Sequence, residues 1–184
     1  MNALLLAPHS DDEALFACYL CLAFKPHIVI CTVSQAQESY GVSAEERASE
    51  SLAVADLLGC ACTQLDFLDT DRGAIRKPLI GWLELHRAHS EEYDVVFAPA
   101  VEEGGNEQHS AVGEAADEVY GEIVVHYLTY TSDGRSRSDT ESEPRDPDWI
   151  GIKLEALSRY RSQLRVPNCR PWFFDLLDLR EWLQ

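Results

Sequence analysis

The sequence is poor in basic residues and contains no long apolar run. Its 15 Lys and Arg stand against 32 Asp and Glu, which gives a formal net charge of −17. Because nucleic acids and anionic membranes are bound largely through Lys and Arg, we expect neither as a partner. No apolar stretch reaches the roughly 18 residues of a transmembrane helix, and no basic segment precedes an apolar one at the amino terminus. We therefore expect a cytoplasmic protein without stable membrane insertion.

Glycine-rich loops, repeats and low-complexity tracts are also missing. No glycine-rich phosphate loop follows the first apolar run, Leu4–Leu6, so nucleotide binding is a weak hypothesis. The 184 residues, 46% of them hydrophobic, are enough for a single domain, residues 1–184, with a sizeable core. The six cysteines mostly fall within apolar patterns, which is typical of reduced and buried side chains in an intracellular protein.

Short apolar runs alternate with helical patterns along the chain. Strands are expected at 4–7, 27–33, 63–68, 95–98 and 123–131, and helices at 12–24, 43–58, 77–92, from His109 onward and at 149–163. The helix at 43–58 has the clearest limits, because Ser43 and Glu46 form a capping box and Gly59 is a stop signal. This alternation predicts an α/β fold: a Rossmann-like open, mostly parallel sheet of about five strands, flanked by helices on both faces.

Chemically versatile side chains follow three of the expected strands. They lie at His9–Asp12, at Asp69–Asp71 and at Asn106–His109. In open α/β sheets the ligands bind at the carboxyl ends of the strands, so the three segments are expected at one edge. His9 and Asp12 are common zinc ligands, but a catalytic zinc site needs a third. The plain alternative is a capping Asp, a solvated Glu and a surface His.

The segment Ala7-Pro8-His9-Ser10-Asp11-Asp12-Glu13 resembles the signature of the PIG-L/LmbE-like family of zinc-dependent N-deacetylases. The stretch Asn106–Gly113 corresponds to that family's second motif, H-x-D-H followed by a helix of small residues. The resemblance continues at Arg47-x-x-Glu50 and from Lys153 to Tyr160-Arg161-Ser162-Gln163. Four motifs in the same order span most of the chain and are far more specific than any one of them.

The resemblance implies a function and a set of roles. His9, Asp12 and His109 would hold Zn²⁺ or another divalent transition metal, and Asp11 would act as general base and then protonate the amine. The substrate would be an N-acetylated amino sugar or sugar conjugate. Arg47 would contact the substrate or its oxyanion, although a surface ion pair with Glu50 is the simpler alternative. The remaining substrate contacts are predicted as Asp69, Asp71 and Gln108.

The second motif departs from the family pattern at two positions. Asn106 replaces a His that assists the reaction, and Gln108 replaces an Asp. An amide donates a hydrogen bond but does not shuttle a proton, so Asn106 is retained as a catalytic candidate with a reduced role. The competing hypothesis is a non-catalytic domain that binds carbohydrate or metal. A phosphatase of the haloacid-dehalogenase type, suggested by Asp69-Thr70-Asp71, is weaker because the motif lies on the third strand.

Two polar or amphipathic segments have less defined roles. The stretch 132–148 is long for a plain connection and is interpreted as a lid over the site. The stretch 171–183 is amphipathic and is expected to pack either on the body of the protein or on a second subunit, so a homo-oligomer is compatible with the sequence.

Overall fold

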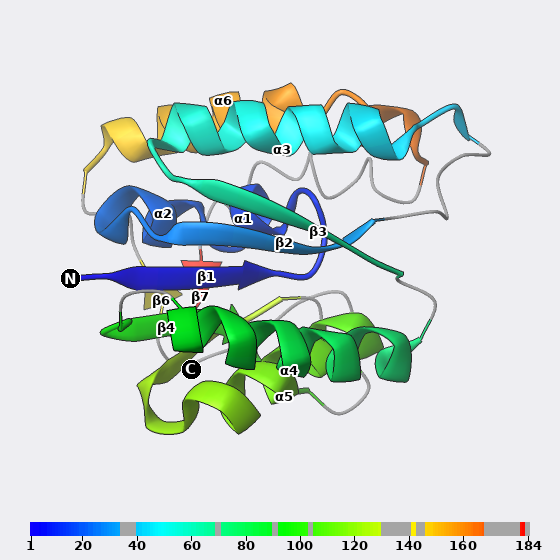
Figure 1. The fold of residues 1–184 in the computed structure, drawn as a ribbon. Coiled ribbons are helices and arrows are strands. Elements are labelled where there is room, and N and C mark those ends of the chain that lie inside the picture. Colours follow the sequence, from blue (N-terminus) through cyan, green and yellow to red (C-terminus); the bar gives the residue numbers. More distant parts are fainter. Residues whose placement is uncertain are drawn as a thin grey trace.

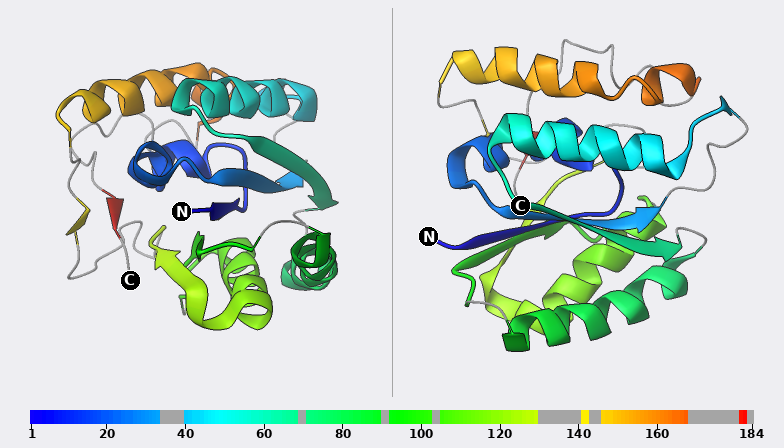
Figure 2. Two further views of the ribbon diagram at one scale, coloured as in Figure 1. Left: turned by 60° about the vertical axis from the view of Figure 1, so that its left-hand side comes forward. Right: turned by 45° about the horizontal axis from the view of Figure 1, so that its top comes forward.

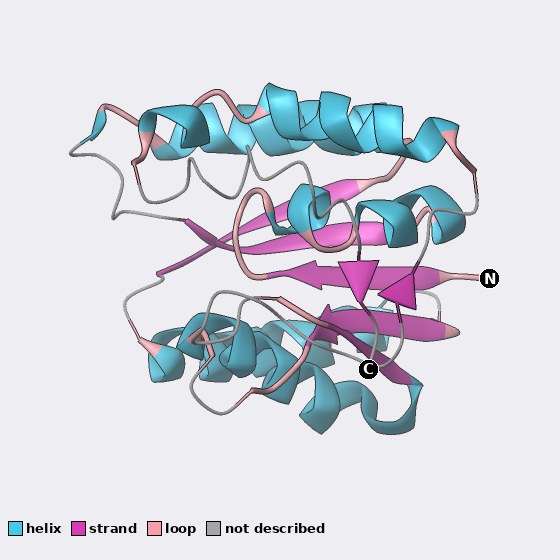
Figure 3. Ribbon diagram, turned by 180° about the vertical axis from the view of Figure 1, so that it is seen from behind, coloured by secondary structure: helices cyan, strands magenta, loops and turns pink. Residues whose placement is uncertain are grey.

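The centre of the computed structural model, which describes residues 1–33, 40–68, 71–89, 92–102, 105–129, 141–142, 146–167 and 181–182, is a five-stranded parallel sheet (Figure 1). Its order is β3-β2-β1-β4-β5. The strands are β1 (Ala3–Ala7), β2 (His27–Val33), β3 (Cys62–Leu68), β4 (Val95–Pro99) and β5 (Val124–Tyr127). The predicted α/β architecture is therefore confirmed. A separate antiparallel pair consists of β6 (Glu141–Ser142) and β7 (Glu181–Trp182), visible in Figure 3.

Helices cover both faces of the sheet (Figure 2). On one face lie α1 (Asp12–Leu15), α2 (Cys18–Phe24), α3 (Ala44–Leu58) and α6 (Asp148–Arg159), and on the other α4 (Arg72–His89) and α5 (Glu107–Tyr120). Two short 3-10 helices complete the described elements, η2 (Gly121–Ile123) and η3 (Gln163–Arg165). In the part of the chain that the structure describes, no helix combines the length and the apolar character needed to cross a membrane.

The central strand β1 is buried on both sides. Leu5 and Ala7 belong to the core beneath α1, α2, α3 and α6, whereas Leu4 and Leu6 belong to the core beneath α4 and α5. This alternation follows from the two-residue period of a strand. It explains why β1 is a continuous apolar run, as is typical of parallel strands covered by helices on both faces.

Several element boundaries differ from those predicted. The helix expected at 12–24 is interrupted between Leu15 and Cys18, although neither Gly nor Pro stands there. The helix expected from Lys77 begins at Arg72, because the Asp71 carboxylate accepts a hydrogen bond from Ala74 N–H at 2.9 Å and caps it. The helix then continues through Pro78.

The remaining boundary differences concern the carboxyl-terminal third. Strand β5 ends at Tyr127 instead of 131, and α6 ends at Arg159 instead of 163, where Tyr160 leaves the helical conformation. The helix that was expected to open at His109 begins at Glu107. Most of the predicted lid, 132–148, and of the amphipathic stretch, 171–183, lies outside the described residues. These two interpretations stay predictions.

The order of the sheet places two loops side by side. The chain moves outward from β1 to β3 on one side, and returns through α4 to β4 on the other side of β1. The loops that follow β1 and β4 therefore meet at the point where the strand order reverses, which is where open α/β sheets bind ligands. His9 and Asp12 belong to the first loop and to α1, and His109 lies in the first turn of α5.

Helix α5 approaches strand β4 closely at Gly113. A Cβ atom there would lie 2.3 Å from the carbonyl oxygen of Pro99, which is far inside the contact distance. Glycine is therefore needed for the helix that carries His109 to pack against the end of the strand.

We predict that Gly113→Ala lowers the free energy of unfolding by about 1–3 kcal/mol, because the backbones of α5 and β4 must separate. The control is Gly151→Ala in α6, where an added Cβ meets nothing within 4 Å and the site is exposed. That variant should gain about 0.5–1 kcal/mol through helix propensity. Urea unfolding measures both, and equal stability of the two variants would contradict the close approach.

Candidate functional site

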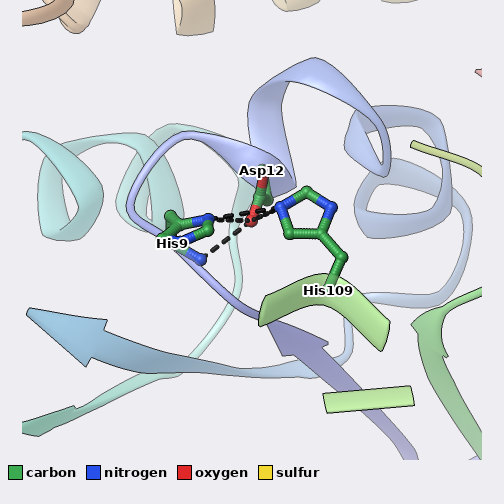
Figure 4. Close-up of side chains that lie close together, drawn as sticks. All are labelled: His9, Asp12 and His109. Carbon is green, nitrogen blue, oxygen red and sulfur yellow. Dashed lines mark hydrogen bonds and ion pairs between the residues drawn. The ribbon is translucent and has the colours of Figure 1, made fainter. Parts of the chain in front are cut away.

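Three side chains from two distant segments meet at the carboxyl edge of the sheet. His9 follows β1, Asp12 begins α1 and His109 lies in the first turn of α5, and Figure 4 shows their side chains converging. Asp12 and His109 are buried, with side-chain exposures of 1%, and His9 retains 15%. Among the described residues, they are the one group of three or more potential metal ligands whose ligand atoms all lie within 4.8 Å of one another.

The three ligand atoms form a nearly equilateral triangle. His9 Nδ1 lies 3.2 Å from His109 Nε2 and 3.4 Å from Asp12 Oδ2, and His109 Nε2 lies 3.3 Å from the same oxygen. A tetrahedral zinc site with bonds of about 2.0–2.1 Å has its ligand atoms about 3.3–3.4 Å apart. The spacing therefore fits a zinc ion bound on one side of the triangle.

The electrostatics of the triangle also fit a cation. Burial alone would raise the pKa of Asp12, but His109 and His9 outweigh it and hold that pKa well below its ordinary range. Asp12 Oδ1 is buried and has no hydrogen-bond partner among the described residues. An ionised carboxylate with one unbonded oxygen, beside two imidazole nitrogens, is a suitable donor set for a divalent metal.

Each imidazole is oriented by a partner on its far side. His9 Nε2 donates to Gln108 Oε1 at 2.8 Å, and His109 Nδ1 lies 2.8 Å from the hydroxyl oxygen of Thr129, to which it donates when Nε2 is left unprotonated to bind a metal. In these tautomers His9 Nδ1 and His109 Nε2 both present a lone pair to the centre of the triangle. Partners of this kind fix the ring orientation of metal-binding histidines.

Asp11 lies beside the triangle and faces Arg47. Its Oδ2 is 3.4 Å from Arg47 Nη2, and the same guanidinium donates to the carbonyl oxygen of Ser10. Burial raises the pKa of Asp11 to about 7, although Arg47 acts in the opposite direction. Because Arg47 is only 4% exposed and has two partners, the surface ion pair with Glu50 is wrong. Glu50 instead accepts a hydrogen bond from Ser162 N–H at 2.9 Å.

The backbone of Asp11 is strained. Its φ of 120° is a conformation that residues with a Cβ rarely adopt, at a cost of about 1–3 kcal/mol. Asp11 N–H donates to Glu13 Oε2 at 3.2 Å, and its carbonyl oxygen accepts from Ala14 and Leu15 N–H at 3.0 and 2.9 Å. These bonds hold the strained turn, in which Asp11 contacts Arg47 and Asp12 contacts the two imidazoles.

Glu13 connects this turn to Tyr160 through hydrogen bonds of its carboxylate. It is 1% exposed and its Oε1 accepts a hydrogen bond from the hydroxyl of Tyr160, which directly follows α6. Burial raises the pKa of Glu13 to about 8, partly offset by that hydrogen bond. Glu13 therefore joins the ligand loop to the carboxyl-terminal end of α6.

The other predicted site residues have structural partners. Asn106 caps α5, because its Oδ1 accepts from Gln108 N–H at 2.8 Å and from His109 N–H at 3.3 Å. The Gln108 side chain contacts His9, a candidate metal ligand, and Asp71 caps α4. Asp69 lies outside the described residues. The catalytic role of Asn106 and the substrate contacts of Gln108, Asp69 and Asp71 stay predictions.

Thr129 was missed by the sequence analysis. It lies two residues beyond β5 and is buried, with an exposure of 5%. A threonine in an apolar segment carries no signal of its own. Its position after the strand next to β4 was the one available indication, since strand ends of a parallel sheet meet at the same edge.

We predict that Thr129→Val weakens zinc binding by about 10- to 100-fold, because His109 loses the partner that fixes its tautomer. The matched control is Thr63→Val, which removes a hydroxyl that lies 2.8 Å from His27 Nε2, a histidine outside the triangle. Competition with a chelating dye measures the dissociation constant of each variant. Equal affinities of the two variants would contradict the orienting role of Thr129.

Solved structures of similar fold include several enzymes. The zinc-inhibited form of teicoplanin deacetylase matches with a TM-score of 0.71 and 18% identity, over 97% of this chain and 91% of that chain. The N,N'-diacetylchitobiose deacetylase of Pyrococcus horikoshii matches with 0.66 and 19%, over 100% and 82%. The 4-carboxy-2-hydroxymuconate hydratase of Pseudomonas putida matches with 0.71 and 16%, over 94% and 83%. At these identities the likeness establishes the fold alone.

The sequence comparisons are more specific. Comparison with curated proteins gave no match. The family model PIG-L, described as GlcNAc-PI de-N-acetylase, matches residues 4–120, which is more than half of the chain and includes His9, Asp12 and His109. The chain therefore belongs to the PIG-L family.

Proposed function

We propose that this protein is a zinc-dependent N-deacetylase that hydrolyses the amide of an N-acetylated amino sugar or sugar conjugate. The observation that carries the proposal is the triangle formed by His9 Nδ1, Asp12 Oδ2 and His109 Nε2, with edges of 3.2 to 3.4 Å. Family membership supplies the reaction class, and the name of the family points to N-acetylglucosamine as the sugar.

The residues of the triangle and their hydrogen-bond partners have distinct roles in this proposal. His9, Asp12 and His109 hold the metal, and Gln108 and Thr129 orient the two imidazoles. When bound, zinc supplies a Lewis acid that polarises an amide carbonyl and makes a water molecule acidic near neutral pH. Three protein ligands leave a position for water and substrate, as is typical of catalytic zinc sites.

Asp11 is the proton-transfer group. It neighbours Asp12 in the chain, and its carboxylate stands in a buried environment that raises its pKa to about 7. A group with such a pKa accepts a proton from the attacking water and returns it to the leaving amine. Asn106 and Gln108 do not titrate, and their amide oxygens are bonded to N–H groups, so both proton steps fall to Asp11.

Arg47 positions Asp11 in this scheme. The guanidinium is buried and bridges the Asp11 carboxylate and the Ser10 carbonyl oxygen. It therefore fixes the direction of the base and opposes the rise of its pKa caused by burial. The contact with a substrate oxyanion, predicted from the resemblance, is less compatible with this arrangement.

The proposal is tested by metal analysis of the purified protein and of His109→Ala. We expect about one zinc per chain in the parent and a loss of most of it in the variant. The control is His89→Ala, an exposed histidine of α4 whose Nδ1 bonds to the Leu85 carbonyl oxygen. Acetate release from N-acetylglucosamine conjugates then tests the reaction. A parent that binds no zinc would contradict the metal site, and binding of sugar without acetate release would favour a non-catalytic domain.

We further predict different effects for the two adjacent aspartates. Asp11→Asn should retain zinc and lower the turnover number by about 10²- to 10⁴-fold, because only the proton-transfer group is lost. Asp12→Ala should lose zinc as well. Parallel metal analysis and acetate assays separate the two effects, and equal loss of zinc in both variants would contradict the role of Asp11 as base.

A further inference from the structure

The helix that carries Asp12 is interrupted after Leu15, and one of the backbone bonds that a continuous helix would have there has both of its groups bonded to side chains. In a continuous helix over 12–24, the N–H of Tyr19 would donate to the carbonyl oxygen of Leu15, four residues earlier. The structure instead separates α1 (Asp12–Leu15) from α2 (Cys18–Phe24). Helix α2 also lacks a capping side chain of its own, because its first flanking residue is Ala17.

A buried ion pair is inserted into the missing bond. Lys153 Nζ donates to the Leu15 carbonyl oxygen at 2.9 Å, and Tyr19 N–H donates to Glu181 Oε2 at 2.8 Å. The two side chains meet each other at 2.7 Å between Nζ and Oε1. The pair therefore satisfies both backbone groups that the interruption leaves open, with charges of the sign that each helix end favours.

The pair is isolated from water and comes from remote parts of the chain. The side chains of Lys153 and Glu181 are 2% and 1% exposed, and Lys153 Nζ also lies 4.9 Å from the centre of the Tyr19 ring. Glu181, in β7, is 162 positions from Tyr19. Both residues lie beyond residues 4–120, the part that matches the family model.

Helix α6 and Tyr160, the residue that follows it, contact α1 at two points. Lys153 reaches the end of α1 at Leu15, and Tyr160, seven residues later, donates to Glu13 in its first turn. Lys153 and Tyr160 therefore hold the first turn and the end of the short helix that begins at Asp12.

We propose that Lys153 and Glu181 are positioning residues of the metal site. By keeping the bond between Tyr19 and Leu15 open, they hold α1 as a separate helix and so fix Asp12 Oδ2 relative to His9 and His109. Without the pair, the open bond closes, α1 aligns with α2, and the carboxylate moves away from the two imidazoles. The proposal rests on the metal site proposed above.

The test compares Lys153→Met, Glu181→Gln and the double variant Lys153→Met with Glu181→Met. Each is studied as the full chain, and its zinc dissociation constant, the visible spectrum of its cobalt(II) form and its urea unfolding are measured. The matched control is Glu155→Gln, which removes an exposed ion pair with Arg159 on the same helix. We expect both single variants to bind zinc at least about tenfold more weakly, and the control to match the parent.

The double variant distinguishes positioning from a purely structural role. Replacing both charges by apolar side chains removes the unpaired charge, so stability should return toward that of the parent. Zinc affinity and the cobalt spectrum should not return, because the helix bond is then free to close. This comparison also decides the question if a single variant does not fold.

Three results would overturn the inference. Single variants with the zinc affinity and cobalt spectrum of the parent would show that the pair does not act on the site. A double variant that regains affinity together with stability would show that the pair acts through stability alone. A parent that binds neither zinc nor cobalt would overturn the proposed metal site itself, and so separates the failure of that proposal from the failure of this one.

Discussion

The convergence of two imidazole nitrogens and one carboxylate oxygen within 3.2–3.4 Å is the constraint on which the rest of the site depends. Lone pairs placed so close together repel one another unless a cation stands between or beside them. The fold meets this requirement by bringing the ends of β1 and β4 together, where the strand order reverses. Helix α5 contacts Pro99 closely because residue 113 is a glycine. This contact fixes the position of His109 relative to the end of β4.

Around the triangle, buried charges are matched by partners from other elements. Arg47 of α3 faces Asp11, Tyr160 donates to Glu13, and Lys153 of α6 pairs with Glu181 of β7. A buried charge without a partner is costly, so each of these contacts also restrains the segment that carries it. The strained φ of Asp11 persists because several such contacts hold the same turn. The segment that carries His9, Asp11 and Asp12 is thus restrained by contacts with residues from other elements.

The succession of strands and of most helices along the chain could be predicted from local patterns. Continuous apolar runs at β1 and β2, and the Ser43 cap with the Gly59 stop of α3, are signals contained within a few residues. The interruption between Leu15 and Cys18 could not be predicted, because no Gly or Pro marks it and its stabilising partners are 138 and 162 positions away. The start of α4 was predicted too late, because the Asp71 cap that sets it was not recognised in the sequence.

By itself, the sequence determined the parallel α/β fold, because strand patterns are local properties, and its resemblance to the PIG-L/LmbE-like family nominated His9, Asp12 and His109 together. Only the tertiary structure decided the partners that make them a site. It turned Gln108 and Thr129 toward the far nitrogens of the imidazoles, set Arg47 against Asp11, and inserted the pair of Lys153 and Glu181 into the helix of Asp12. The physical reason is that hydrogen bonds and ion pairs depend on positions and directions fixed by the whole fold, which no short segment encodes.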